Sequence, residues 1–125
     1  MTMPKTILLV DDEKPLLMSL SEGLSMLDKN LYVLTAENGE EAIEILNSSD
    51  IDLIITDLKM PKKDGFDLLM YKYNNCPHVP AIVMTAQYGQ NILRRLDDIG
   101  VYCMEKPLDF DELANKVFSL LEKEV

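Results

Sequence analysis

Three short apolar runs, none interrupted by a polar residue, constrain the fold of this chain more than any other feature. They span Ile7–Val10, Leu53–Ile55 and Ala81–Met84. A strand with one face in solvent alternates apolar and polar residues, whereas an uninterrupted apolar run indicates a strand that is buried on both faces. The sequence therefore predicts a parallel sheet covered by helices on both sides.

Two weaker runs, Leu31–Leu34 and Val101–Met104, are typical of the edges of such a sheet. Apolar residues at helical spacing fill the gaps between strands. Pairs of residues typical of helix N-termini precede two of these segments, and Pro15 suits the first helical position of another. The helical segments are marked by Leu17, Leu20, Leu24 and Leu27 behind Pro15; Ala42, Ile43 and Leu46 behind Asn38 and Glu41; Phe66, Leu69 and Met70; Ile92, Leu93 and Leu96; and Leu113, Val117, Leu120 and Leu121 behind Asp109 and Glu112.

Five strand–helix units with short connections predict a single α/β domain. We expect the flavodoxin-like doubly wound (βα)5 arrangement, with a five-stranded parallel sheet in the order 2-1-3-4-5. A length of 125 residues suits one domain with a real core, so residues 1–125 are expected to form one unit without a separate output domain. In this fold the functional crevice lies beyond the carboxyl ends of the first and third strands.

The composition argues against several classes of partner. The net charge is −10, and no cluster of Lys or Arg resembles a footprint for nucleic acid, so direct nucleic-acid binding is not expected. The sequence has no apolar stretch long enough to span a membrane and no signal-peptide pattern, so a cytoplasmic protein without membrane contact is predicted. The cysteines, Cys76 and Cys103, lack metal-ligand spacing and are expected to be free thiols.

Polar residues gather at the carboxyl edge of the predicted sheet. The first, third, fourth and fifth strands run into Asp11 and Asp12, Asp57, Thr85 and Lys106, respectively. Each residue alone is an ordinary helix start, cap or surface residue, but together they are specific. Two carboxylates about 4 Å apart repel by about 4 kcal/mol at an effective dielectric constant near 20. The cluster must therefore take up protons or bind a cation, and Mg²⁺ suits hard, partly hydrated oxygen ligands.

This set of groups is typical of phosphoryl transfer, which needs a nucleophile, a divalent metal, a fixed cation and a hydroxyl group. Asp57 is the predicted nucleophile because it lies alone on the central strand, across the switch point from the other two acids. The segments Met60–Pro61 and Asp64–Gly65 are expected to shape the loop that returns the chain to the next helix.

The sequence closely resembles the receiver domain of bacterial two-component response regulators from Lys5 to about Lys123. Four motifs carry the resemblance in order and spacing: ILLVDDE at Ile7–Glu13, TDLKMPKKDG at Thr56–Gly65, IVMTA at Ile82–Ala86 and EKP at Glu105–Pro107. The resemblance implies that Asp57 is phosphorylated by a phosphohistidine of a sensor histidine kinase or a phosphotransfer protein. The resemblance further implies that the chain catalyses only its own phosphorylation and dephosphorylation, so it is expected to be a signalling phosphoacceptor and not an enzyme.

The resemblance also implies a ligand set for Mg²⁺. Asp12 and Asp57 would bind the ion, Asp11 would assist partly through water, and the backbone carbonyl of Lys59 would complete the protein ligands. Lys59 and Gln87 flank the expected path of attack and are predicted to tune the rate of dephosphorylation.

The remaining site residues are implied to act as a switch. Thr85 would donate a hydrogen bond to the phosphoryl group and move inward, Lys106 would pair with a phosphoryl oxygen, and the bond before Pro107 would be cis. The surface expected to report the change covers Asn91–Leu121. We expect contact with a downstream protein target, as a monomer or as a weak phosphorylation-dependent dimer.

One departure from the family pattern concerns the aromatic residue usually found three positions before the lysine. Cys103 holds that place here, and Tyr102 precedes it. Because a one-residue shift along a strand reverses the face of a side chain, either residue could occupy the usual aromatic position.

Three rival functions can be weighed from the same residues. A flavodoxin-like nucleotide or flavin carrier needs a phosphate-cradling loop where this chain has Asp11, Asp12 and Glu13. A haloacid-dehalogenase-like phosphatase needs an acid two residues after the nucleophile, where Lys59 stands. The remaining alternative is a receiver-like docking module that works without phosphorylation, which the complete set of site residues disfavours.

Overall fold

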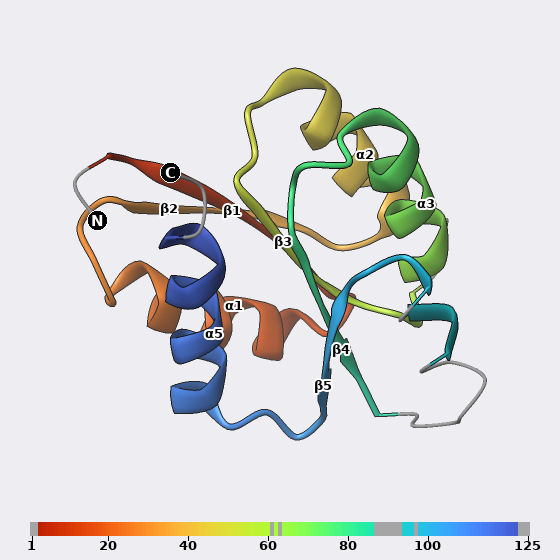
Figure 1. Cartoon of the computed structure of the whole chain (residues 1–125). Helices are drawn as coiled ribbons and strands as arrows, with labels where there is room; N and C mark the ends of the chain where they lie inside the picture. Colours follow the sequence, from red (N-terminus) through yellow and green to blue (C-terminus); the bar gives the residue numbers. More distant parts are fainter. Residues whose placement is uncertain (1–2, 61, 63, 87–93, 97, 123–125) are drawn as a thin grey trace.

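The computed structural model describes residues 3–60, 62, 64–86, 94–96 and 98–122. Its five strands form one parallel sheet in the order β2-β1-β3-β4-β5, which confirms the predicted fold (Figure 1). The strands are β1 Lys5–Val10, β2 Leu31–Ala36, β3 Leu53–Asp57, β4 Ala81–Thr85 and β5 Tyr102–Glu105.

The strands β3 and β4 extend further than the apolar runs that predicted them. Thr56 and Asp57 continue β3 and pair with Val83 and Met84, and Thr85 is the last residue of β4. Backbone pairing does not depend on side-chain polarity, so the ladder continues into the polar residues. The consequence is that Asp57 is anchored by the sheet itself.

Four helices are described in full, on both faces of the sheet. They are α1 Lys14–Ser25, α2 Gly39–Ser48, α3 Gly65–Asn75 and α5 Phe110–Glu122. In Figure 1, α1 and α5 cover one face, and α2 and α3 cover the other. Of the fourth predicted helix, Ile92 and Leu93 lie outside the described residues, whereas Leu96 is helical and buried. Within the described part of the chain, no helix is both long and apolar enough to cross a bilayer.

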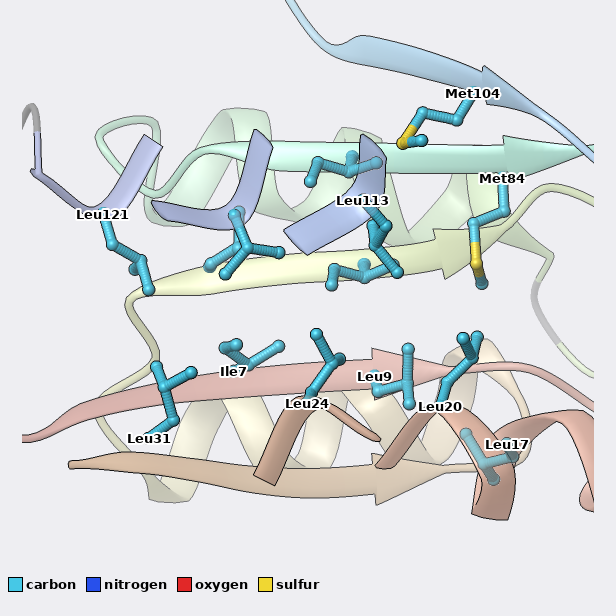
Figure 2. Packing of buried hydrophobic residues seen from close by; sticks show 14 residues of the cluster. Ile7, Leu9, Leu17, Leu20, Leu24, Leu31, Met84, Met104, Leu113 and Leu121 are labelled. Carbon is cyan, nitrogen blue, oxygen red and sulfur yellow. The ribbon is translucent and has the colours of Figure 1, made fainter. Parts of the chain in front are cut away.

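The core explains why the strand sequences are uninterrupted apolar runs. Successive residues of β1 alternate between two buried clusters: Ile7 and Leu9 pack with α1 and α5, and Leu8 and Val10 pack with α2 and α3. Figure 2 shows the first cluster between the sheet and its two helices. Because both faces of the central strands are buried, a polar side chain there loses its water and needs a partner within the protein, as the Thr56 hydroxyl has in the Asp57 carbonyl at 2.9 Å.

The helix starts follow the predicted caps. The Asn38 side chain accepts a hydrogen bond from the Glu41 amide at 2.8 Å, and the Asp109 side chain accepts one from the Glu112 amide at 3.1 Å. Helix α1 begins one residue before Pro15, so this proline lies in the first turn. These caps start α2 and α5 at the carboxyl edge of the sheet, from which each helix runs back toward the amino edge.

Candidate functional site

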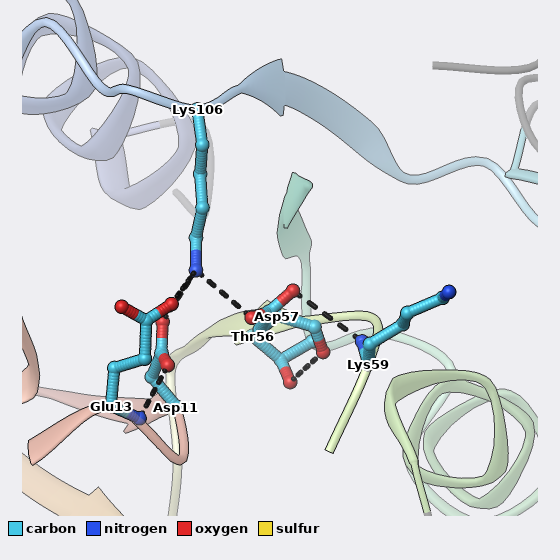
Figure 3. Close-up of polar contacts among 6 residues, drawn as sticks. All are labelled: Asp11, Glu13, Thr56, Asp57, Lys59 and Lys106. Carbon is cyan, nitrogen blue, oxygen red and sulfur yellow. Dashed lines mark hydrogen bonds and ion pairs between the residues drawn. The ribbon is translucent and has the colours of Figure 1, made fainter. Parts of the chain in front are cut away.

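The acidic residues and the lysine predicted from the strand ends lie together at the carboxyl edge of the sheet. Asp11 follows β1, Asp57 ends the neighbouring strand β3, and Lys106 follows β5. Strands β1 and β3 are adjacent although β2 lies between them in sequence, which makes this edge the switch point of the doubly wound fold. Figure 3 shows the Lys106 side chain extending from its own strand to the two aspartates.

The Lys106 amine bridges three carboxylates. Its Nζ lies 2.9 Å from Asp57 Oδ2, 3.0 Å from Asp11 Oδ2 and 3.4 Å from Glu13 Oε1. The Lys106 side chain is only 13% exposed, that of Asp11 is fully buried and that of Asp57 is 11% exposed, so these two contacts are shielded from water, whereas the Glu13 side chain is 63% exposed. Charge-assisted contacts of this kind are stronger than exposed ion pairs. Lys106 therefore holds Asp11, which follows β1, and Asp57, which ends β3, in a fixed arrangement.

The charges of the cluster shift the pKa of two of its members. Burial alone would lower the pKa of Lys106, but hydrogen bonds and attraction from Asp57 and Asp11 outweigh it and raise the pKa well above its usual range. Loss of solvation, reinforced by repulsion from Asp11 and Asp57, raises the pKa of Asp12 above the ordinary 3.8. Lys106 therefore remains cationic, and the cluster still carries uncompensated negative charge.

The cluster fits a hard divalent cation. Asp11, Asp12 and Asp57 each offer one carboxylate oxygen, and these oxygens lie within 4.8 Å of one another. Asp12 is exposed to solvent, so an ion held there could keep several of its waters. Since repulsion already raises the pKa of Asp12, a cation would be stabilised by the same charges that the protein leaves unpaired. The donor set suits Mg²⁺ better than a soft metal, because it contains only oxygen.

The two buried aspartates differ in how their oxygens are used. Asp11 directs Oδ2 to Lys106 and accepts the Glu13 amide on Oδ1 at 2.9 Å, so both oxygens are engaged in short contacts. Asp57 also contacts Lys106 through Oδ2, but within the described residues its Oδ1 accepts only a long hydrogen bond of 3.4 Å from the Lys59 amide. Of the oxygens of these two aspartates, Asp57 Oδ1 is therefore the least engaged by the described residues.

The loop after Asp57 is shaped by close packing against the strand end. A Cβ atom at Gly65 would lie 2.7 Å from Leu58 Cα and would also clash with the Asp57 carbonyl oxygen, so only glycine fits. The Gly65 amide donates to the Leu58 carbonyl at 2.8 Å. Asp64 and Asp67 form a reciprocal capping box that starts α3 at this point. Of the predicted turn residues, Pro61 lies outside the described residues, whereas Asp64 and Gly65 start α3 directly beside the end of β3.

The other predicted site residues are placed as follows. Thr85 is buried at the end of β4, and its carbonyl accepts a hydrogen bond from the Lys106 amide at 2.9 Å. Lys59 is exposed, and its side chain points away from the acids in Figure 3. The Lys106–Pro107 bond is cis, as the resemblance implied. Gln87 lies outside the described residues, as do the first three residues of the surface predicted to begin at Asn91.

The structure separates Tyr102 from Cys103. Cys103 packs partly buried against the cluster on the α2 and α3 side of the sheet, whereas Tyr102 is exposed and is covered by the Lys116 amine, 3.9 Å from its ring centroid. The exposed aromatic ring therefore lies on the α5 side of β5, and the position three before Lys106 holds a small thiol.

Sequence reasoning missed one member of the cluster. Glu13 was expected only as part of an acidic loop, yet its carboxylate contacts Lys106. The signal available was a third acid directly after Asp11 and Asp12, at the start of α1.

Comparison with known proteins agrees with this geometry. Residues 7–118 match the family described as the response regulator receiver domain. Among curated proteins, the chain is 35% identical to the transcriptional regulatory protein GlrR of Escherichia coli K12, over 96% of this chain and 27% of that protein. It is 36% identical to the transcriptional regulatory protein CpxR of the same strain, over 94% of this chain and 49% of that protein. The chain thus spans a quarter to a half of these relatives.

Solved structures give the same picture. The response regulator protein TrrA from Thermotoga maritima, in a complex with Mg²⁺-BeF, is 33% identical with a TM-score of 0.82, covering 94% of this chain and 99% of that chain. A CheY-like receiver domain protein from Methanospirillum hungatei JF-1 has a TM-score of 0.89 at 23% identity, covering 96% and 95% of the two chains, and supports the fold alone.

Proposed function

Because the chain belongs to the response regulator receiver family, we propose that Asp57 accepts a phosphoryl group in a Mg²⁺-dependent reaction. The donor is a phosphohistidine on a sensor histidine kinase or a phosphotransfer protein. Receiver domains are signalling phosphoacceptors rather than enzymes that turn over a separate substrate. Residues 1–125 act as one receiver domain in this proposal.

The observation that carries the proposal is the bridge of Lys106 between Asp11 and Asp57. It places a cation within 3.0 Å of both buried carboxylates, and among the described residues Asp57 Oδ1 accepts a single long hydrogen bond. A structural ion pair would be complete with one carboxylate and one lysine. This cluster instead holds an excess of acids around an exposed opening at Asp12, which is the arrangement that phosphoryl transfer needs.

The transfer follows from these positions. Asp57 Oδ1 forms the new bond to phosphorus as the bond from phosphorus to the donor imidazole breaks, and the electron pair of that bond leaves with the imidazole nitrogen. Lys106 Nζ, already beside Asp57, offsets negative charge on the transferred group. Asp11, Asp12 and Asp57 would hold Mg²⁺, with the Lys59 carbonyl as a further ligand. When bound, the ion supplies positive charge to the equatorial phosphoryl oxygens.

The switch is proposed to follow from a new acceptor at Asp57. A phosphoryl group there offers oxygens to the Thr85 hydroxyl, which is buried at the end of the adjacent strand β4. Lys59 and Gln87 are proposed to tune the hydrolysis of the acyl phosphate. Because the chain covers only part of its curated relatives, the downstream target is proposed only as a protein. The expectation that this chain does not itself bind nucleic acid stays a prediction.

An apolar hollow beside the cluster supports a protein as the phosphodonor. It has a volume of about 720 Å³ and is lined by Leu16, Ser19 and Leu20 of α1 and by Phe110 of α5, and Lys106 belongs both to its wall and to the acidic cluster. A partner that fills this hollow with apolar side chains would bring its phosphohistidine to the same edge of the sheet. Acetyl phosphate, a small donor, would not need the hollow.

The direct test is labelling with acetyl phosphate, followed by intact-mass measurement. We expect wild-type protein to gain one phosphoryl group with Mg²⁺ and none with EDTA. Asp57→Asn should gain none, and Asp50→Asn, a change of an exposed aspartate away from the site, should label as wild type does. Persistent labelling of Asp57→Asn would refute the nucleophile, and a wild type that never labels, with any donor, would favour the phosphorylation-independent docking module.

The hollow has its own test. Ser19 is exposed and lines it, so Ser19→Arg should slow transfer from a phosphorylated histidine kinase about tenfold or more by blocking a well-packed contact, on the scale at which interface residues act. Labelling of the same variant by acetyl phosphate should be unchanged. Equal slowing with both donors would indicate damage to the site and would remove the hollow from the docking surface.

A further inference from the structure

The edge strand β2 lacks the features that normally protect the edge of a sheet. Within the described residues it pairs only with β1, and Figure 2 shows it as the lowest strand of the sheet. Its six residues, LYVLTA, include no charged residue and no proline. Natural edge strands are usually short, charged, bulged or covered, because their open backbone groups can pair with another chain. The opposite edge, β5, is shorter and carries Glu105.

The backbone of β2 is ready to pair on its outer side. The carbonyls of Asn30 and Ala36 accept hydrogen bonds from β1 at the two ends of the ladder. Because alternate residues of a strand in a parallel pair point their backbone groups toward that partner, the even-numbered residues here face β1. The odd-numbered residues point their N–H and C=O groups outward: Leu31, Val33 and Thr35.

We propose that two copies of this chain associate through β2, antiparallel about a two-fold axis at Val33, into one continuous sheet. In this register Val33 lies opposite Val33 of the second copy, and Thr35 lies opposite Leu31. The outward amides of Val33 and Thr35 then meet outward carbonyls. The Leu31 amide keeps its own bond to the Asp28 carbonyl, at 3.1 Å.

The side chains favour the same register. Tyr32 and Leu34 are 56% and 37% exposed, although they are large apolar residues on a strand. With Val33 on the axis, each Tyr32 lies opposite Leu34 of the second copy, and an aromatic–aliphatic cross-strand pair is stabilising. On the other face of the sheet, the exposed Met18 of α1 and Thr35 line a hollow of about 180 Å³ beside the edge, which the second copy would cover.

Charges at the ends of the strand fit a second copy rather than an unrelated partner. Lys29 precedes β2 by two residues and Glu37 follows it by one, so the register that centres Val33 places Lys29 opposite Glu37 of the second copy, twice by symmetry. Glu37 forms an ion pair with the exposed Lys14, at 3.6 Å, and an exposed pair of this kind is weak enough to exchange. This pairing offsets part of the repulsion between two chains of charge −10.

The proposed contact does not involve the acidic cluster. The sheet places β2 two strands away from β3, which carries Asp57. Association should therefore be the same in Asp57→Asn and in wild-type protein, unlike the phosphorylation-dependent dimer expected from the family resemblance.

The first test is sedimentation velocity over a range of concentrations. An interface of two short strands is small, so we expect a weak, concentration-dependent dimer. Leu34→Lys should raise its dissociation constant about tenfold, since it removes two symmetric apolar pairs and places charge on the edge. Met70→Lys, a matched change of an exposed apolar residue on α3, should leave it unchanged. A wild-type protein that sediments as a monomer at every concentration overturns the proposal.

A charge exchange tests the register. Glu37→Lys should weaken the dimer, because the new lysine side chain lies opposite Lys29 of the second copy. The double variant Lys29→Glu/Glu37→Lys should restore wild-type association. Loss of affinity without restoration would contradict the proposed pairing, because the double variant keeps the opposite charges.

Cross-linking tests the two-fold axis. In a background with Cys76→Ser and Cys103→Ser, Val33→Cys should form a disulfide dimer on oxidation, since opposed residues lie about 5.5 Å apart between Cα atoms. Thr35→Cys should not, because four residues of strand, about 13 Å, separate it from its own copy. Circular dichroism of both variants checks that they fold. Equal cross-linking at the two positions would place the axis elsewhere and overturn the proposed register.

Discussion

Two lysines with little exposure, one at the carboxyl end of the sheet and one on α3 near its amino end, show what distinguishes a functional site from ordinary burial. Lys106 lies at the carboxyl edge between Asp57 and Asp11, and these acids raise its pKa despite burial. Lys72 of α3 is only 6% exposed, and its amine donates at 3.3 Å to the Pro77 carbonyl, in the loop that leads into the amino end of β4. Within the described residues it forms no ion pair, and burial lowers its pKa.

The difference teaches that burial of a charge is not by itself a functional signal. Lys72 reaches a carbonyl at the protein surface with a long aliphatic stem and tolerates partial loss of its proton. Lys106 is surrounded by more negative charge than it can neutralise. The site edge is therefore defined by an excess of acids, and four measurements can break or sharpen this contrast.

The largest expected effect is on stability. Without Mg²⁺, Lys106→Met should lower the free energy of unfolding by about 3 kcal/mol, because breaking a buried ion pair leaves uncompensated carboxylates. Lys72→Met, which replaces a lysine by an apolar side chain of similar length, should change it by less than about 1 kcal/mol, because only a single hydrogen bond is lost. Urea unfolding in EDTA measures both variants, and equal losses would abolish the contrast between the two edges.

The pKa values of the two amines should also be shifted in opposite directions from the ordinary value. The Lys72 amine should lose its proton below the ordinary pKa of 10.5, and the Lys106 amine should keep its proton above that value. NMR of the side-chain nitrogens in labelled protein follows each one, with Lys72→Met and Lys106→Met as assignments. A Lys106 that titrates before Lys72 would show that the acids do not hold its charge.

The same shifts predict how stability depends on pH. For Lys72 the folded pKa lies below the unfolded value, so its penalty is present at lower pH and is relieved as pH rises toward 10.5. For Lys106 the folded pKa lies above the unfolded value, so its stabilisation is present below 10.5 and is lost only as pH rises through the folded pKa. Relative to Lys72→Met, wild-type protein should accordingly gain stability as the pH rises toward 10.5.

The smallest effect concerns Asp12. Its folded pKa is raised, so its repulsion destabilises the metal-free protein at neutral pH and is relieved as pH falls through that pKa toward the unfolded value near 3.8. Asp12→Asn should therefore melt slightly above wild type in EDTA at pH 7, and the difference should shrink as the pH is lowered toward 4. Thermal unfolding at both pH values measures it, and a variant that melts below wild type at pH 7 would contradict the repulsion.

Much of the fold and the core of the site could be predicted from the sequence. The apolar runs identified every strand because residues such as Leu8 and Leu9 enter different clusters on opposite faces. The ends of parallel strands share one edge, so Asp11, Asp57 and Lys106 could be brought together from topology alone. These features were predictable because they depend on where the backbone segments lie and not on side-chain conformation.

Features that depend on side-chain conformation were beyond the sequence. The Glu13 contact with Lys106 depends on the rotamers of two long side chains. The burial of Lys72 depends on a backbone carbonyl of Pro77, which leaves no side-chain pattern to read. The positions of Tyr102 and Cys103 depended on a one-residue register, and only the pairing of β4 with β5 resolves it.

The central claim is that the excess acids at the carboxyl edge form a cation site, and calorimetric titration with Mg²⁺ tests it most directly. We predict that one Mg²⁺ binds to wild-type protein and that Asp12→Asn weakens binding about tenfold or more, the usual scale for loss of one good contact. Asp50→Asn, a change of an exposed aspartate elsewhere, should bind as wild type does. The account would be contradicted if Asp12→Asn bound Mg²⁺ as tightly as wild type, or if wild-type protein bound none.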